Sequence, residues 1–359
     1  MNVNEYDRKY FRYNSTVTTP RYGRTQDDGQ FLGLSMVKTK FGWRKTPYVS
    51  KQKFNLKIAP FGNGAVRFKY LGNFPNKFGK VDLSPQALLL IPEFENWFGL
   101  GNETTNPFVE REFHWVRMRS LELSPLIEFN GNNLGKVSFK IGPTYQLVNI
   151  TNSLTRVSND EVLGLDEADL TTNHFIGGLA IFNLGFEDNS LVPSNGLNFN
   201  GEFRYLNNFS QNENLFQMDL STDFYISLAK NPQLVFAHVL GYRKVFGDPQ
   251  FHQYPDLGND TNLRGFRDER FRGESAIYHN MDLRLHLFNW NNRVLPLGIN
   301  IYGGFDYGRV YFEPEESNTW HYSTTLGLSF NVLGAFLVNP TYSFTEEGNS
   351  FNFRFGYNF

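Results

Sequence analysis

Strict alternation of apolar and polar side chains is the feature that most constrains the fold of this sequence. In residues 216–228, FQMDLSTDFYISL, one set of alternate positions holds Phe, Met, Leu, Thr, Phe, Ile and Leu, and the other holds Gln, Asp, Ser, Asp, Tyr and Ser. A period of two places these sets on opposite faces of a β-strand. The same alternation recurs in residues 137–147, 197–205, 277–287 and 350–359.

The length of these segments separates two all-β architectures. Strands of a soluble sandwich usually span about 5–6 residues, but a strand that crosses a bilayer needs about 9–11, with an apolar face toward lipid and a polar face toward the lumen. Aromatic residues form 17 % of the chain, and Tyr and Trp favour membrane interfaces. The longest apolar run, Ala87–Ile91, is far short of the roughly 20 residues of a membrane-spanning helix. The pattern therefore predicts a transmembrane antiparallel β-barrel.

About fifteen alternating segments follow one another along the chain, centred near residues 35, 55, 69, 89, 120, 143, 178, 201, 221, 240, 282, 300, 326, 340 and 355. Single-chain bacterial barrels have an even number of strands. We therefore predict sixteen strands, with the sixteenth near Lys9–Val17 or inside residues 110–128. Residues 1–20 are expected to be a lead-in segment or the first strand, and residues 21–359 the barrel domain. The amino terminus lacks the apolar core of a secretory signal, which is typical of a mature portion or a fragment.

Composition argues against several classes of function. The chain has no cysteine and a net charge of −2, so we expect no disulfide, no thiolate metal site and no nucleic-acid partner. The seven histidines form no ligand cluster, and the acidic stretch 160–169, DEVLGLDEAD, could hold a divalent cation between lipopolysaccharide molecules but is more typical of a solvated loop. No nucleophile elbow or phosphate-binding loop is present. We expect no enzymatic activity, no metal and no cofactor.

The longest break in the alternation, residues 247–273, is rich in arginine. It ends in NLRGFRDERFRG (262–273), which holds four arginines and two aromatic residues. Downstream, GGFDYGRVY (303–311) places an aspartate between glycines in an otherwise apolar strand. Small neighbours leave room for a group to approach this acid, and a guanidinium facing a carboxylate can make two parallel charge-assisted hydrogen bonds.

These two motifs resemble those of the BamA/TamA superfamily of outer-membrane assembly and translocation barrels. The lumen-loop motif is Leu263, Arg264, Gly265 and Phe266, and the strand motif is Gly304, Asp306 and Gly308. The resemblance implies that the loop after the eleventh strand folds into the lumen, where Arg264 pairs with Asp306. Five segments follow the loop, as a sixteen-stranded member requires.

The resemblance extends to RFRGESAIYHNMDLRL (270–285), GFDYGRVYFE (304–313), DDGQFLGL (27–34) and FGLGNET (98–104). These segments look similar to a subgroup of bacterial surface-antigen barrels in which a calcineurin-like phosphoesterase precedes the barrel. The chain contains neither that phosphoesterase motif nor polypeptide-transport-associated repeats. Its last strand is similar to the signal that hands barrels to the insertion machinery, with aromatics at Phe355, Tyr357 and Phe359.

The function that this resemblance implies is insertion or translocation of proteins or lipids across the outer membrane of a Gram-negative bacterium. The implied partners are outer-membrane lipid and lipopolysaccharide, the barrel-insertion machinery and client proteins. Two alternatives remain: a membrane anchor for a separate amino-terminal enzymatic domain, and a passive pore. A folded-in loop makes the pore less attractive because it narrows the lumen.

Overall fold

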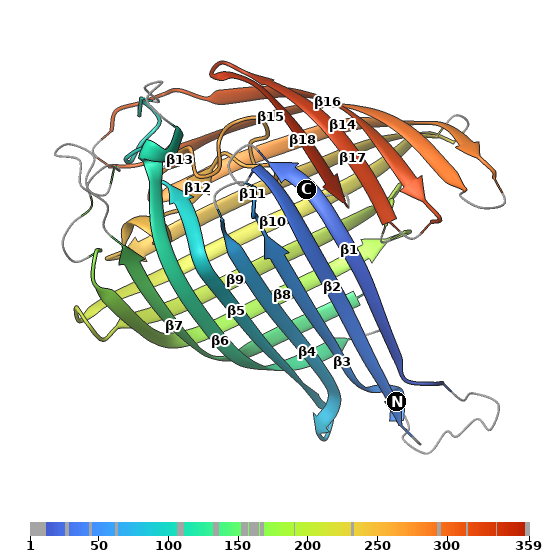
Figure 1. Ribbon diagram of the computed structural model, residues 1–359, viewed down its shortest axis with the longest axis horizontal. Coiled ribbons are helices and arrows are strands. Elements are labelled where there is room, and N and C mark those ends of the chain that lie inside the picture. The colour runs from blue at the N-terminus through green and yellow to red at the C-terminus, as the bar shows by residue number, and fades with distance from the viewer. Residues whose placement is uncertain are drawn as a thin grey trace.

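Sixteen strands close into one antiparallel barrel in a computed structural model of the chain (Figure 1). Each strand pairs with its neighbour in the sequence, except that β11 pairs with β14 across an inserted segment, and β18 returns to β1. The structure describes residues 12–25, 29–42, 45–61, 64–105, 111–131, 136–151, 157, 165, 169–189, 191–230, 233–292, 296–313, 315–334 and 336–355.

The predicted sixteen-stranded antiparallel barrel is confirmed. The barrel strands are β1 (Ser15–Thr25), β2 (Gly29–Gly42), β3 (Lys45–Ile58), β4 (Val66–Phe78), β5 (Val81–Asn96), β6 (Trp115–Gly131), β7 (Lys136–Thr151), β8 (Thr172–Glu187), β9 (Gly196–Asn208), β10 (Glu213–Lys230), β11 (Gln233–Gly247), β14 (Ser275–Trp290), β15 (Leu297–Tyr311), β16 (His321–Val332), β17 (Phe336–Thr345) and β18 (Gly348–Phe355).

The strand that the alternation did not count is β1, which overlaps the first of the two expected positions, whereas residues 115–131 form the single strand β6. β1 also spans the boundary drawn at residue 20. The division of the chain there remains a prediction.

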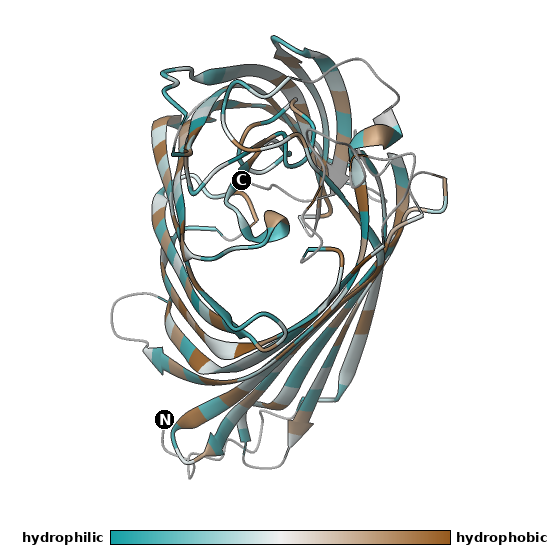
Figure 2. Cartoon of the chain, turned by 90° about the vertical axis from the view of Figure 1, so that its left-hand side faces the viewer, coloured by the Kyte–Doolittle hydropathy of each residue, from teal (hydrophilic) through white to brown (hydrophobic). Residues whose placement is uncertain are grey.

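Hydropathy alternates along the strands, as the teal and brown bands in Figure 2 show, and the exposed fractions place the apolar set outside and the polar set inside. In β14 and β15, Leu283 and Phe305 are 46 % and 40 % exposed on the outer face, whereas the intervening Asp282 and Asp306 are buried. An apolar outer band around a polar interior is the arrangement that a bilayer-spanning barrel requires. No helix in the described ranges is both long and apolar enough to cross a membrane.

The connection between β11 and β14, residues 248–274, is named the inner segment below. It contains a short 3-10 turn, η3 (Phe251–Gln253), and a two-stranded sheet of β12 (Asp256–Leu257) and β13 (Phe271–Arg272). A second connection, residues 97–114, ends in the turn η1 (Arg111–His114), and its Gly101 pairs with Arg272. Two long connections therefore meet at the same end of the barrel.

Two apolar clusters anchor these connections to the barrel wall. The first joins Trp97 and Phe251 to buried side chains of β6 to β11. The second joins Leu257, Leu263, Phe266 and Phe271 of the inner segment to Val239, Ala276, Tyr278 and Val310 of β11, β14 and β15. Burial of whole aromatic and leucine side chains gives the inner segment a fixed position without extended pairing to the wall.

A glycine under an aromatic ring shapes the wall beside the second cluster. The ring of Tyr278 lies over Gly241 on the neighbouring strand, and a Cβ on Gly241 would lie 2.1 Å from that ring. We predict that Gly241→Val destabilises the barrel by about 1–3 kcal/mol, because the tyrosine would have to leave its packed position. The measurement is the denaturant midpoint followed by the gel mobility of the folded barrel.

The matched control is Gly303→Val on β15. A Cβ there would meet only the Leu326 side chain, at an ordinary 3.8 Å, and valine suits a strand better than glycine does. Equal destabilisation by the two variants would show that the Tyr278 ring does not restrict position 241.

Candidate functional site: a buried arginine between two strands

Arg264 of the inner segment binds Asp306 of β15 through three hydrogen bonds. Its Nε donates to Oδ2 at 2.7 Å, its Nη2 to Oδ1 at 2.5 Å and its backbone N–H to Oδ2 at 3.2 Å. Asp306 is fully buried and Arg264 is 6 % exposed. A guanidinium that binds both oxygens of a carboxylate fixes orientation as well as distance, so this pair defines where the segment sits on the wall.

Asp282 of β14 is a second carboxylate partner. Arg264 Nη2 donates to its Oδ1 at 2.9 Å, and its Oδ2 accepts from Arg284 Nη2 at 3.2 Å. Burial opposes the charge of Arg264, but the carboxylates of Asp282 and Asp306 outweigh that effect and raise its pKa above the usual value. Two arginines and two aspartates form a neutral buried group, which is the condition under which buried charges are tolerated.

Glycines make room for this group on both sides. A Cβ on Gly304 would lie 2.6 Å from Arg264 Nη2 and 2.6 Å from Asp282 Oδ1. Gly265 has a φ of +95°, and a Cβ there would lie 2.8 Å from Ser343 Cβ on β17. Only glycine combines that backbone conformation with so close an approach to the wall. Gly308 is also confined, since a Cβ there would lie 3.0 Å from Leu257 Cδ1.

The two apolar members of the loop motif pack rather than bind. Leu263 is fully buried, and Phe266 is 3 % exposed. The Phe266 ring makes an edge contact with Phe271 at 5.4 Å between centroids and another with His321 at 6.0 Å. These contacts exclude water around Arg264, so its hydrogen bonds lie in a low-dielectric environment.

The other three arginines of the segment reach different parts of the wall. Arg267 Nη2 donates to Asn96 Oδ1 of β5 at 2.6 Å. Arg270 Nε donates to Glu347 Oε1, beside β18, at 2.6 Å and Nη1 donates to Thr104 Oγ1 at 2.7 Å. Arg272 Nη2 donates to Glu95 Oε2 of β5 at 2.7 Å. The arginines therefore tie the segment to β14 and β15, to β5 and to the turn before β18.

Sequence reasoning named Arg264 and Asp306, and the structure brings them together with Gly304 and Gly265. It did not name Asp282, Glu95, Asn96 or Glu347 as partners. The signal for Asp282 was present, because it alternates with outward leucines in residues 277–287 and so faces the interior. The other three lie on or next to strands distant in sequence, and no local pattern marks them.

Two further predicted sites are only partly described. Of the carboxyl-terminal signal, Phe355 ends β18, and Tyr357 and Phe359 lie outside the described residues. Most of the acidic stretch 160–169 also lies outside them. Within the described ranges, no three His, Asp or Glu side chains are placed to hold a metal ion.

Two buried titratable groups accompany the arginines inside the segment. Both ring nitrogens of His252 are buried without a hydrogen-bond partner among the described residues. Burial, followed by the charge of Arg272, lowers the pKa of His252 to about 3. Burial and then the neighbouring charge of Asp268 raise the pKa of Glu269 well above its usual value, and Glu269 Oε2 accepts the Asn96 N–H at 3.1 Å.

The closure between β1 and β18 contrasts with the rest of the barrel. β1 pairs with β2 along its whole length, Ser15–Thr25, but among the described residues it meets β18 at the single pair Arg24 and Phe353. We name this closure the seam. Tyr22 adds a ring contact to Phe353 at 6.3 Å between centroids. Within the described ranges, no other register pair joins the two strands.

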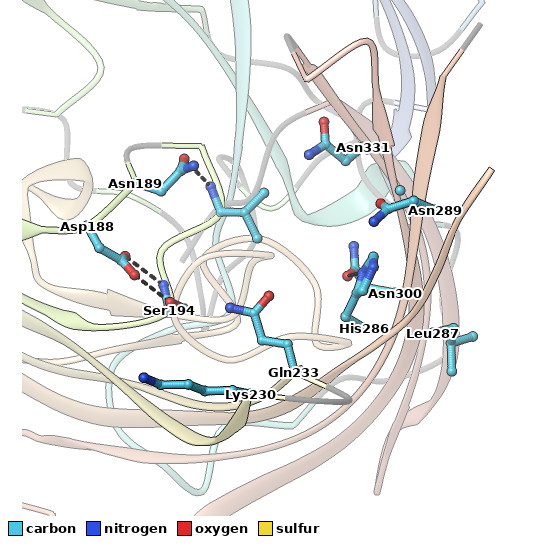
Figure 3. A pocket seen from close by; sticks show the side chains of 12 residues that line it. Asp188, Asn189, Ser194, Lys230, Gln233, His286, Leu287, Asn289, Asn300 and Asn331 are labelled. Atoms are coloured by element: carbon cyan, nitrogen blue, oxygen red, sulfur yellow. Dashed lines mark hydrogen bonds between the residues drawn. The ribbon is translucent and has the colours of Figure 1, made fainter. Parts of the chain in front are cut away.

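The opposite mouth of the barrel holds a polar cavity of about 580 Å³ (Figure 3). It lies between the turns after β8 and β10 and the far ends of β14 to β16, away from the inner segment. Asp188 accepts hydrogen bonds from the Ser194 backbone N–H, at 2.9 Å, and from the Ser194 hydroxyl, which holds the β8–β9 turn. The lining is rich in amides: Asn189, Gln233, Asn289, Asn300 and Asn331.

Several solved structures share this fold. BamA from Haemophilus ducreyi lacking POTRA domains 1–3 matches with a TM-score of 0.67 and 11 % identity over 96 % of this chain and 70 % of that one. CdiB from Escherichia coli matches with a TM-score of 0.66 and 10 % identity, and CdiB from Acinetobacter baumannii with a TM-score of 0.61 and 12 % identity. The Escherichia coli match covers 94 % of this chain and 62 % of the CdiB chain. The Acinetobacter baumannii match covers 95 % of this chain and 59 % of the CdiB chain. The chain therefore has the fold of the BamA and CdiB barrels.

One protein-family model matches the part of the chain that contains the site. Residues 211–332 match the model of the haemolysin secretion/activation protein family ShlB/FhaC/HecB. This range runs from the turn before β10 to the end of β16 and includes Arg264, Asp282 and Asp306. No curated protein matches the chain.

A double-mutant cycle tests the coupling of Arg264 and Asp306. We expect Arg264→Ala and Asp306→Ala each to lower stability by about 3–5 kcal/mol, because each leaves buried charge uncompensated. The double variant should cost less than the sum by about 1–3 kcal/mol. Denaturant unfolding in detergent, read from gel mobility, gives the four free energies.

The reference cycle uses Lys136 and Glu187, a pair that is 3.5 Å apart with the lysine 80 % exposed. Its coupling should be about 0.2–1 kcal/mol. Additive losses at Arg264 and Asp306 would contradict the pairing.

The depressed pKa of His252 predicts a pH dependence of stability. The contribution of the neutral His252 to the free energy of unfolding is fully present above pH 6.5, about the pKa of histidine in the unfolded state. It is lost as pH falls toward 3, because only the unfolded state then takes up the proton. His252→Leu should therefore lose less stability than wild type over this range, by at most about 1.4 kcal/mol per pH unit. Thermal unfolding at pH 8, 6 and 4 measures the difference. The control, Phe251→Leu, changes a neutral neighbour and should lower the stability equally at the three pH values. An equal change at all three pH values in His252→Leu would show that the histidine ring is not buried in its neutral form.

Proposed function

We propose that this barrel inserts or translocates polypeptides across the outer membrane of a Gram-negative bacterium. The fold shared with BamA and CdiB supports this role, as does the match of residues 211–332 to a family of haemolysin secretion/activation proteins. The apolar outer band suits a bilayer. Client proteins are the proposed partners, lipopolysaccharide the proposed surrounding lipid, and the insertion machinery the proposed reader of Phe355, Tyr357 and Phe359.

The observation that carries the proposal is a seam with a single described residue pair beside a firmly pinned wall. One described residue pair joins β1 to β18, whereas the buried arginines hold β14 and β15 and the turn before β18 to the inner segment. Unpaired backbone at a strand edge is a template for another strand. A seam that opens while the adjacent wall keeps its shape can accept a client strand and release it laterally.

A second candidate is a membrane anchor for an enzymatic domain. It is favoured by the similarity of residues 270–285 and 304–313 to barrels preceded by a calcineurin-like phosphoesterase. Under that reading the seam would have no role. An experiment that locks the seam therefore separates the two functions.

The seam can be locked with a disulfide, because the natural chain contains no cysteine. Directly opposed residues in an antiparallel pair have Cβ atoms about 4.5–5.5 Å apart, close to disulfide geometry. We predict that Arg24→Cys with Phe353→Cys, once oxidised, lowers by at least about tenfold the surface or medium level of client proteins. Quantitative proteomics of the source bacterium, comparing a deletion strain with complemented strains, identifies those clients and measures the loss.

The control is Val17→Cys with Val37→Cys, which joins β1 to β2 at an existing register pair. It should leave client levels unchanged, and reductant should restore them in the seam variant. An unchanged proteome on deletion would contradict translocation and favour the anchor. Full client levels with the seam locked would contradict release through the seam.

A further inference from the structure

One wall of the barrel carries an uncompensated positive charge. Between Gly29 and Val81 the sequence has eleven lysines and arginines and no aspartate or glutamate. The whole chain has 34 lysines and arginines and 36 aspartates and glutamates. This range forms β2, β3 and β4, the blue strands beside the seam in Figure 1. The imbalance is therefore concentrated on one side of the barrel.

Strand register places many of these cations on the lumen face. Lys51 lies opposite Asn73, whose side chain donates to Ser84 and Glu128 across the interior. The alternate positions hold outward residues such as Leu56, which is 39 % exposed. With Arg21 of β1, the lumen-facing set is named the cationic wall: Arg21, Lys51, Lys53, Lys57, Arg67 and Lys69.

Within the described part of the chain, four members of this wall have no carboxylate within ion-pair distance: Arg21, Lys51, Lys53 and Lys69. The charges that act on Lys53 are Arg21, Lys69 and Lys51, all of the same sign. Like charges held together destabilise a fold unless an anion joins them. The wall is therefore arranged to receive one.

The lumen-facing glutamates Glu122 and Glu128 of β6 and Glu202 of β9 have partners of their own. Glu122 and Glu202 accept hydrogen bonds from Arg204 at 3.0 and 2.9 Å. Glu128 lies 3.9 Å from Lys140 and accepts from Ser84. These carboxylates already have cationic or hydroxyl partners of their own.

The spacing of the cations selects the form of the anion. Same-face residues of a strand are about 7 Å apart, so Lys51 and Lys53 are consecutive steps of a ladder along the strand, and Lys57 lies two steps beyond Lys53. An extended polypeptide with acidic residues at alternate positions can place a carboxylate opposite each of these lysines. The ladder faces the lumen, whereas lipid phosphates would meet Lys38 and Lys40, which lie on the same outward face as Leu34 and Met36.

We propose that the cationic wall binds an extended acidic segment of the translocated polypeptide next to the seam. This proposal rests on the proposed function and names its substrate class. Carboxylates of the segment neutralise the ladder while its backbone lies within reach of the edge of β1. The electrostatic attraction also raises the rate at which an acidic segment enters the lumen.

The test uses the full chain in a zwitterionic detergent and fluorescent dodecapeptides of alternating Glu and Ser, measured by anisotropy. We expect binding that weakens as salt is raised from about 0.1 to 1 M, where screening shortens from about 10 to 3 Å. Lys51→Gln with Lys53→Gln should weaken binding at least about tenfold. A peptide of alternating Gln and Ser should not bind.

The matched control is Lys38→Gln with Lys40→Gln, which removes the same charge from the outer face and should bind the acidic peptide like wild type. Equal binding of acidic and neutral peptides, or no loss in the Lys51 and Lys53 variant, would overturn the proposal. So would binding of a bisphosphorylated lipid A, but not the peptide, that depends on Lys51 and Lys53.

This measurement needs neither a moving seam nor a natural client. Loss of peptide binding together with a seam lock that abolishes translocation would remove the acidic-segment proposal and leave translocation intact. Peptide binding together with unchanged client levels in the deletion strain would remove the translocation proposal and leave the acidic-peptide site intact.

Discussion

The buried group of Arg264, Asp306, Asp282 and Arg284 is the interaction on which the arrangement of this barrel depends. A lone guanidinium in that position would be strongly unfavourable, and two carboxylates without it would repel each other. Together they are neutral and hydrogen-bonded, so the inner segment can lie against β14 and β15 instead of in solvent. Gly304 and Gly265 are required there because the charged atoms and the wall leave no space for a Cβ.

Once the segment is held there, its other arginines connect parts of the wall that the chain itself does not connect. Arg267 and Arg272 reach β5, and Arg270 reaches the turn before β18. The wall is thereby braced on both sides of β1 to β4, whereas the described residues of the seam form one register pair. The strands that carry unbalanced positive charge are thus also those nearest to the edge that can open, which links the proposed binding of acidic segments to the proposed site of release.

The fold was predictable to a large extent because a bilayer imposes one rule on every strand. Alternation in residues such as 216–228 and 277–287 identified fifteen strands and the direction in which each side chain points. β1 was not counted because STVTTPRYGRT has few apolar residues on its outward positions, and it is recognised as a strand only by pairing with β2. Arg264 and Asp306 were found through paired motifs, but Glu95, Asn96 and Glu347 were not, because nothing local marks a contact between residues so far apart in sequence.

The sequence by itself determined that this chain forms a closed antiparallel barrel with a polar interior, since period-two hydropathy and the need to pair every backbone group in lipid leave few alternatives. It also determined that positive charge is concentrated in residues 29–81. Tertiary structure alone decided which charges meet. Closure of the barrel places the buried aspartates around Arg264, gives the acids of β6 and β9 their own cations, and leaves the lysines of β3 facing an open lumen, because the distances that set electrostatic energy exist only after the strands have closed.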